Sequence, residues 1–209
     1  MSVVKRKRKE SQFEVVHHFY KLRRKVTDYL LCNFGYDYEK FKKKMAKSLG
    51  DRTYEDLDEK EQRAYDRKVE KNLAFDKWFI ENERNLVVEC LRTITEEIFM
   101  TNSIYPNYSE ELIERRIHQD RAIGQCYRLL QELQYIVETL PVKVDKYLPY
   151  AQDIDKEIAL LKAWRKSDNK FKGKLCSASN FANVNNNGNA NDNNASNANG
   201  VRPDFDATI

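Results

Sequence analysis

The stretch RIHQDRAIGQCYRLLQELQYIVETLPV, residues 116–142, decides the fold. Its apolar residues are spaced alternately three and four positions apart, at Ile123, Cys126, Leu130, Leu133, Val137 and Leu140. A stripe with this spacing covers one face of an α-helix and is typical of the seam between packed helices. Pro141 ends the segment, because proline lacks the N–H group that a helix interior needs.

The same period recurs before this segment. Apolar residues at steps of three, four or seven predict a helix over about 11–33, which Gly35 ends, and a long helix over about 60–101. Ser109, followed by acidic residues, looks like the start of the central helix, since a serine hydroxyl caps free N–H groups there. These segments give the first three long helices of the chain.

A fourth helix follows the central one. Pro149 can open it, because proline is tolerated in a first helical turn. Its buried stripe would contain Ile154, Ile158 and Leu161, and it would end near 167–168. Four amphipathic helices with two short connections predict an all-α, antiparallel up-down four-helix bundle.

The bundle is expected over 11–170, with a basic N-terminal arm at 1–10. The connection between its first two helices, about 35–60, is a long insert, in which we expect a short extra helix near 38–48 and a polar loop. Residues 171–209 form an Asn-rich tail, which we expect to be disordered because it has too few large apolar residues to offset ordering entropy.

Composition excludes several classes of protein. The 209 residues include only 6 Gly and 4 Pro, too few for a turn-rich β fold, and no Gly-rich phosphate loop occurs. No apolar run approaches the roughly 18–20 residues of a membrane span, and we expect neither a secretory signal nor membrane association. The four cysteines form no Cys-x-x-Cys pair, which indicates a reducing, cytoplasmic location.

No catalytic or metal-binding constellation is readable. A di-iron bundle needs Glu-x-x-His motifs on paired helices, and no matching pair occurs. His17, His18 and His118 are expected at the surface or at an interface, whereas Cys90 and Cys126 fall on apolar stripes and are expected in the core. We therefore predict no enzyme activity, no catalytic residue, no metal and no cofactor.

The basic residues are more informative. Residues 1–176 contain 36 Lys and Arg against 30 Asp and Glu, a net charge of +6. Cations cluster where acids are scarce, at 5–9, 21–25 and 162–174, which favours binding to a polyphosphate backbone. In the helix over 60–101 acids interleave with the cations, which indicates an ordinary solvated face. The candidate contacts to nucleic acid or a protein partner are Arg23, Arg24, Lys25, Arg115, Arg116, Arg121, Lys162, Arg165 and Lys166.

The tail segment NFANVNNNGNANDNNASNANGVRPDF, residues 180–205, resembles the translated template repeat of a diversity-generating retroelement. In such elements a reverse transcriptase misincorporates opposite template adenines. Asparagine codons begin with two adenines, and GVRPDF matches the usual unvaried end of these repeats. The basic helical body, with 116–142 and DKEIALLKAWRKSDNK at 155–170, resembles the accessory variability proteins (Avd) of these elements. The Lys-rich insert and the basic arm depart from shorter family members.

The resemblance implies a non-catalytic accessory factor. Such a factor forms a homopentamer, binds the reverse transcriptase of its cassette and the template RNA or its cDNA, and supports adenine-directed mutagenic cDNA synthesis (mutagenic retrohoming). Three alternatives remain open: a general RNA-binding or ribosome-associated four-helix bundle, a metal-dependent bundle enzyme, and the diversified binding protein of a retroelement.

Overall fold

The computed structural model describes residues 12–175, with side chains from Glu14 onward. Every regular element in this part of the chain is helical, so the all-α prediction is confirmed. The predicted basic arm and residues 176–209 of the predicted tail lie outside the described residues. The elements are α1 (Gln12–Leu31), η2 (Asn33–Gly35), α2 (Tyr38–Lys47), η3 (Tyr54–Asp56), α3 (Glu59–Ser103), α4 (Ser109–Thr139) and α5 (Val144–Ser167).

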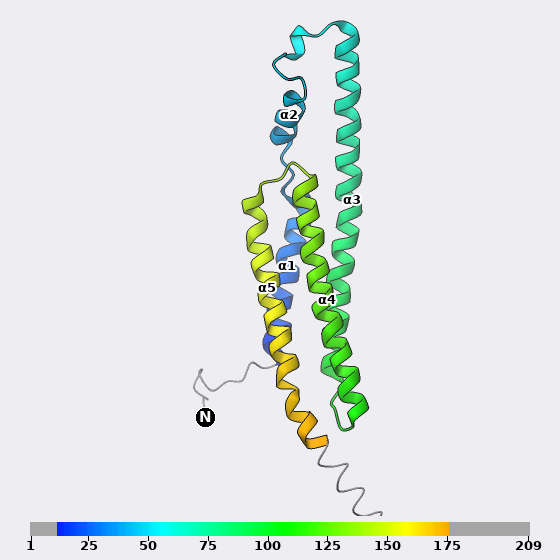
Figure 1. The fold of residues 1–209 in the computed structure, drawn as a ribbon, viewed down its shortest axis with the longest axis vertical. Coiled ribbons are helices and arrows are strands. Elements are labelled where there is room, and N and C mark those ends of the chain that lie inside the picture. Colours follow the sequence, from blue (N-terminus) through cyan, green and yellow to red (C-terminus); the bar gives the residue numbers. More distant parts are fainter. Residues whose placement is uncertain (1–11, 176–209) are drawn as a thin grey trace, which may run out of the picture.

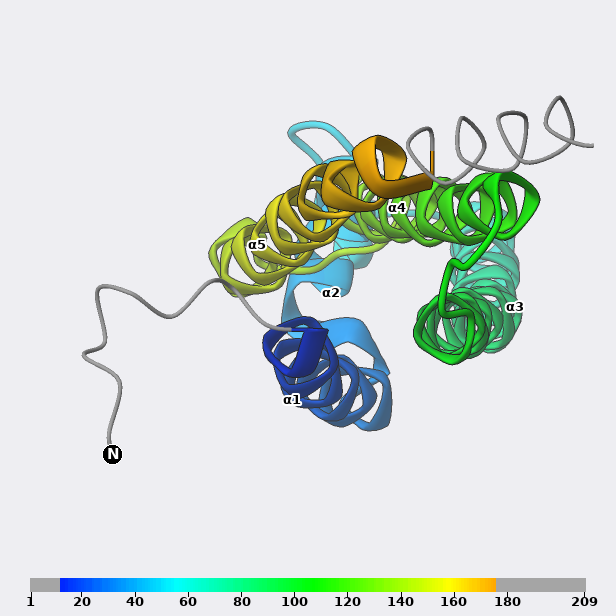
Figure 2. The ribbon, with the colours of Figure 1, turned by 90° about the horizontal axis from the view of Figure 1, so that it is seen from below.

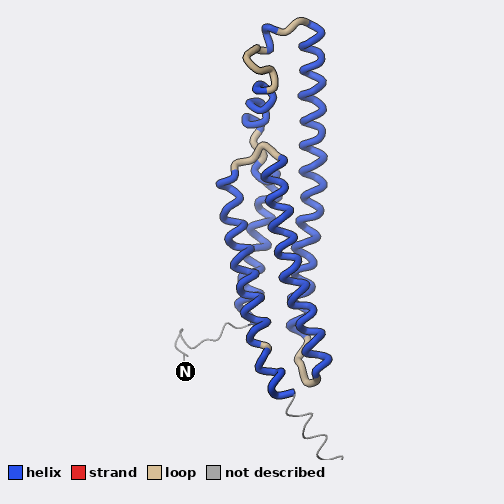
Figure 3. The backbone as a smooth tube through the Cα atoms, in the orientation of Figure 1, coloured by secondary structure: helices blue, strands red, loops and turns tan. Residues whose placement is uncertain are grey.

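The long helices lie side by side. Figure 1 shows α1 running up the molecule, α3 running down, α4 running up and α5 running down. Viewed along its length, α5 lies between α1 and α4, and α4 contacts α3 on its other side (Figure 2). The first part of α3 extends well beyond α4 and α5, with α2 and the loop after it beside it (Figure 3). The predicted insert therefore lengthens one end of the molecule.

The end of α1 is set by a tight turn. Asn33, Phe34 and Gly35 all have positive φ angles, of 49°, 59° and 73°. This left-handed conformation is unfavourable for phenylalanine. Phe34 is nevertheless held there, because its ring is fully buried and meets Tyr29 edge-on at 5.8 Å between ring centres.

Acidic caps fix the starts of α2 and α3. The Asp37 carboxylate accepts hydrogen bonds from the backbone N–H groups of Glu39 and Lys40, at 3.1 and 3.2 Å. Asp58 and Glu61 form a reciprocal capping box, in which each side chain accepts from the other residue's backbone N–H. These local bonds explain why α3 begins at Glu59, close to its predicted start.

The prediction that Pro149 opens the last helix is wrong. The helix α5 begins at Val144, and Pro149 lies inside it. A proline in the second turn removes a single backbone hydrogen bond, the one that would reach the carbonyl of Asp145. The first turn of α5 is therefore formed by residues that the sequence pattern assigned to a loop.

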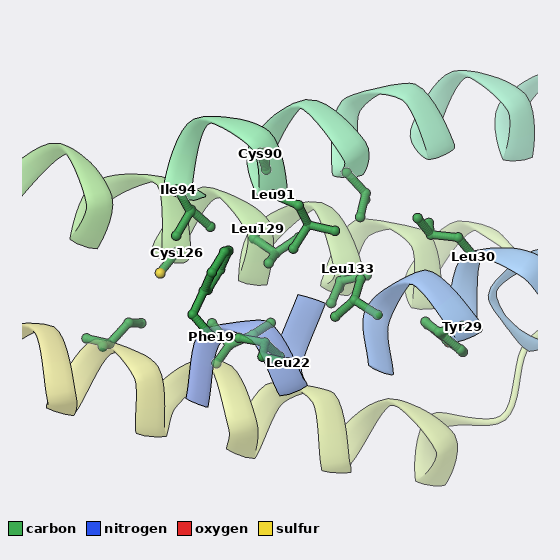
Figure 4. Close-up of a cluster of buried hydrophobic side chains, with 14 of the residues drawn as sticks. Phe19, Leu22, Tyr29, Leu30, Cys90, Leu91, Ile94, Cys126, Leu129 and Leu133 are labelled. Carbon is green, nitrogen blue, oxygen red and sulfur yellow. The ribbon is translucent and has the colours of Figure 1, made fainter. Parts of the chain in front are cut away.

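The core is built from apolar side chains of all four long helices, several of which are labelled in Figure 4. In α4 the fully buried stripe includes Leu129 and Ile136, whereas Leu130 and Val137, which the spacing predicted, are only half-buried. Both registers alternate three and four residues, so spacing alone did not distinguish them. Contact with α3 and α5 on either side of α4 decides which residues point to the centre.

After a turn at Asp168, residues 169–175 are again helical. Within this segment Phe171 is buried, 8% exposed, and meets Tyr105 edge-on at 5.7 Å. The helical part thus extends five residues past the predicted boundary of the tail. Across the described residues, no helix combines the length and the apolar character that crossing a membrane requires.

Candidate nucleic-acid interface

The line of contact between α4 and α5 holds two of the predicted cations. Arg165 forms an ion pair with Asp120, with 2.7 Å between Nε and Oδ1, and its Nη2 donates to Oδ2 at 3.0 Å. One turn away, Nζ of Lys162 donates to the Tyr127 hydroxyl at 2.7 Å and lies 5.2 Å from the centre of its ring. Because the partner of Lys162 is a hydroxyl rather than a carboxylate, Lys162 keeps its positive charge uncompensated at this contact.

Three further candidates lie on the same two helices. Nη2 of Arg116 donates to Oδ1 of Asn169 at 2.5 Å, which ties α4 to the segment after α5. Arg121 and Lys166 are exposed, and neither forms an ion pair with any residue that the structure describes. They are therefore available to an anionic ligand without breaking an internal contact.

The cations of α1 have different environments. Arg23 donates to the Thr95 hydroxyl of α3 at 3.1 Å, and Lys25 forms an ion pair with Asp153 of α5 at 2.5 Å. Lys25 also lies 5.4 Å from the ring centre of Tyr150. Arg24 is exposed and forms no ion pair with a described residue. Two of these three cations thus join α1 to its neighbours, and Arg24 alone among them faces solvent freely.

Arg115 is a correction to the predicted interface. Its side chain is 2% exposed, its Nε lies 2.6 Å from Oδ2 of Asp168, and its Nη1 donates to the carbonyl oxygens of Thr101 and Ile104. The guanidinium group also lies 5.2 Å from the ring centre of Trp164. A group enclosed in this way does not reach a surface phosphate, so Arg115 stabilises the fold and leaves the candidate set.

The remaining eight candidates do not form one continuous face. Arg116, Lys162, Arg165 and Lys166 gather where α4 meets the end of α5. The α1 cations lie apart from this group: Arg23 contacts α3 and Lys25 contacts α5. The structure therefore brings about half of the predicted residues together, and the α1 cations do not join them.

Two of the three histidines lie at contacts between helices, within the surface or interface positions that the sequence predicts. His18 of α1 and His118 of α4 have side chains that are 13% and 12% exposed. Nδ1 of His18 lies 2.6 Å from Oε2 of Glu157, and Nδ1 of His118 lies 2.5 Å from Oε2 of Glu97. Each of these histidines is half-buried against a carboxylate that a neighbouring helix supplies, which a single helical pattern does not reveal. His17 is exposed, as predicted.

Burial dominates the electrostatics of the His18–Glu157 pair. Glu157 is fully buried, and desolvation raises the pKa of its carboxyl group to about 8. Burial also lowers the pKa of His18. Both shifts favour an uncharged pair, in which the carboxyl group donates its proton to Nδ1. The pair thereby joins α1 to α5 in the interior.

The predicted positions of two cysteines are confirmed, because Cys90 and Cys126 have no exposed surface. Desolvation raises the pKa of both thiols. Among the side chains of residues 14–175, no group of three or more His, Cys, Asp or Glu is arranged to hold a metal ion.

The sequence interpretation missed cations on the first half of α3. Asp66 and Glu70 border one surface groove together with Lys77. Another hollow is lined by Arg67, Lys68 and Lys71, with Ala64 and Asn72. Acids and bases that alternate in sequence are thus separated around the helix. A helical projection of 60–80, rather than a count of charges, would have revealed this.

No family model, no curated protein and no solved structure matches this chain.

Proposed function

We propose that this chain is a non-catalytic accessory factor of a diversity-generating retroelement. In this role it binds the reverse transcriptase of its cassette and the template RNA, and it supports adenine-directed mutagenic cDNA synthesis in the cytoplasm. The observation that carries the proposal is the sequence of 180–205, where an Asn-rich segment ends in GVRPDF. A low-complexity segment would account for the asparagines but not for the motif that follows them.

The proposal includes an antiparallel up-down four-helix bundle that assembles as a homopentamer. The alternating directions of α1, α3, α4 and α5 support this architecture. A ring of five subunits would offer five copies of each cationic group to one RNA, which raises the overall affinity without any new contact.

Exposed cations support the RNA-binding part of the proposal. Arg24, Arg121, Lys162 and Lys166 are exposed, and none forms an ion pair within the described residues. Cations of this kind bind phosphates by releasing condensed counterions. Tyr127, which is 44% exposed beside Lys162, adds an aromatic ring on which an unpaired base can stack.

The RNA-binding experiment uses the purified full chain and RNA transcribed from the 3′ end of its own gene. Fluorescence anisotropy between 50 and 200 mM salt gives the slope of log affinity against log salt. The double variant Arg121→Ala/Lys166→Ala should flatten that slope by up to about 1.8, or roughly 0.9 for each phosphate contact. The matched control is Arg52→Ala/Arg63→Ala, which removes two arginines that already pair with Glu61 and Glu59.

A second experiment separates the RNA from the peptide. Synonymous recoding of 180–199 removes adenines and keeps the protein unchanged, and it should abolish mutagenesis of the target gene. Truncation after Cys176, with the RNA left intact, should be nearly harmless. A flanking near-copy of the repeat that differs only at adenines would support the proposal. A chain that binds RNA but ignores the reverse transcriptase would favour the general RNA-binding alternative.

A further inference from the structure

The first half of α3 presents a face on which cations are followed by aromatic rings. Lys68, Lys71, Phe75 and Trp78 are spaced three, four and three residues apart, which places them on one side of the helix. Both lysines are exposed, and the rings of Phe75 and Trp78 are 46% and 61% exposed. These residues belong to the first half of α3, the helix whose first part extends beyond the ends of α4 and α5 (Figure 1).

The cations of this face are not neutralised from within the molecule. Lys68 and Lys71 have no carboxylate within 4.0 Å among the described residues, and Arg67 uses its Nε to donate to a backbone oxygen. Two of the nearby acids have partners elsewhere: Glu59 pairs with Arg63 at 2.6 Å, and Asp66 accepts from the Tyr54 hydroxyl at 3.0 Å. Glu70 borders the groove on the other side of the helix. The hollow lined by Arg67, Lys68 and Lys71 is therefore a concentrated positive site.

The aromatic rings form a supported platform. The rings of Phe75 and Trp78 lie 5.9 Å apart between centres, and Phe75 lies 5.9 Å from Phe79, stacked at 25°. Phe79 is buried and meets Tyr135 of α4 edge-on at 5.3 Å. The exposed pair is thus anchored to the interior, while the indole ring keeps most of its surface in water. The pair therefore offers ring surface to a ligand from a fixed position.

We propose that Arg67, Lys68, Lys71, Phe75 and Trp78 bind a single-stranded segment of nucleic acid. The cations contact successive phosphates, and unpaired bases stack on Trp78 and Phe75. Proteins hold single strands without reading their sequence by combining a positively charged surface with exposed aromatic rings. A helix rises about 1.5 Å per residue, so Lys71 and Trp78 lie roughly 10 Å apart along the axis, within reach of one short strand.

Nucleic acid fits this face better than an acidic peptide does. Three of the five side chains that line the hollow are cations and none is a carboxylate. The exposed rings of Phe75 and Trp78 add flat surfaces on which unpaired bases stack. This proposal rests on the proposed function only in taking RNA as the ligand. It places single-strand binding on the first half of α3, away from the cations where α4 meets α5.

Tryptophan fluorescence of the full chain gives a direct readout. The protein has two tryptophans: Trp78 is 61% exposed, and Trp164 is 3% exposed. Titration with a 15-nucleotide oligouridine should quench the emission, because a stacked base contacts the indole of Trp78. The Trp78→Phe variant should lose this response while the emission of Trp164 persists. A 15-base-pair RNA duplex, whose bases are already stacked, should quench far less.

Affinity measurements test the same residues. Phe75→Ala/Trp78→Ala should weaken oligouridine binding about tenfold or more. Lys68→Ala/Lys71→Ala should flatten the salt slope by about 1.4, or roughly 0.7 per phosphate of a single strand. Lys77→Ala is the matched control, because Lys77 borders the acidic groove on the other side of the helix. Circular dichroism verifies that each variant stays helical.

Four outcomes would overturn the inference. Oligouridine binding that is unchanged in both double variants would show that this face is not the site. A change in sedimentation with Trp78→Ala, without any change in affinity, would identify a contact between copies of the chain instead. If the wild-type chain binds neither oligouridine nor its own transcript, the proposed function fails as well. If the chain binds its transcript and only Arg121→Ala/Lys166→Ala weakens that binding, the proposed function would stand without the inference about α3.

Discussion

Arg115 and Asp168 form an ion pair inside the protein, with 2.6 Å between Nε and Oδ2 and side chains that are 2% and 1% exposed. Gln119 donates to the same carboxylate oxygen at 2.8 Å, and Arg115 also donates to the carbonyl oxygens of Thr101 and Ile104. One guanidinium group thereby joins the ends of α3 and α5 to the start of α4. The positions of the cations where α4 meets the end of α5 depend on this network.

Arg115→Ala should lower the free energy of unfolding by about 3–5 kcal/mol, because it leaves the buried Asp168 carboxylate without its partner. Urea denaturation followed by circular dichroism measures the loss. The double variant Arg115→Met/Asp168→Leu should be less destabilised than Arg115→Ala, since it leaves no unpaired charge. Equal destabilisation of the two would show that packing, rather than charge, accounts for the effect.

Glu157→Gln should change how stability depends on pH. Burial raises the pKa of Glu157 to about 8 in the folded chain, above its ordinary value of 4.5. The folded state therefore holds a proton that the unfolded state releases, so the free energy of unfolding falls as pH rises toward 8. Between pH 6.5 and 8 the free energy of unfolding should fall by about 2 kcal/mol.

Urea midpoints at pH 6.5, 7.25 and 8 test this prediction. The lowered pKa of His18 acts mainly below pH 6.5, where it makes stability rise with pH, so His18 contributes little in this window. Burial also raises the pKa of Glu83, and the comparison with the variant separates Glu157 from it. Glu157→Gln should flatten the decline, because an amide does not titrate. Parallel curves for the wild type and the variant would contradict an uncharged Glu157 at neutral pH.

Arg24→Ala should affect mainly RNA binding, whereas Lys25→Ala should affect mainly stability. Arg24 is exposed without an ion pair in the described structure, so its loss should leave stability within about 0.5 kcal/mol and weaken RNA binding. Lys25 pairs with Asp153 at a partly exposed site, so its loss should cost about 0.5–1 kcal/mol. Thermal unfolding and RNA titration of both variants measure the contrast. Equal effects on RNA binding would indicate that the Lys25 pair opens when RNA binds.

Thiol reactivity should distinguish the cysteines. Cys32 is exposed, whereas Cys90 and Cys126 are buried and their pKa values are raised by desolvation. In a Cys176→Ser variant, a chromogenic disulfide reagent at pH 8 should label Cys32 quickly. The two buried thiols should react only after urea is added. Fast labelling of all three would mean that the core opens readily.

The helices themselves could be predicted from the sequence because their determinants are local. The apolar period, the Asp58–Glu61 capping box and the stop at Pro141 all act within a few residues. The first exception is local, whereas the second was decided by the helices that pack against α4. Pro149 misled the prediction because one missing hydrogen bond is tolerated inside α5, and the register of α4 was ambiguous because two stripes share the same spacing.

The sequence by itself determined a helical, cationic chain and the Asn-rich segment on which its proposed role rests. Only the tertiary structure decided which cations are available to a ligand. Arg115 and Arg116 are neighbours in sequence, yet the first is enclosed by Asp168 and the second lies at the surface contact with Asn169. Adjacent side chains point about 100° apart on a helix. The helix that packs against each of them therefore determines whether its charge stabilises the fold or faces a partner.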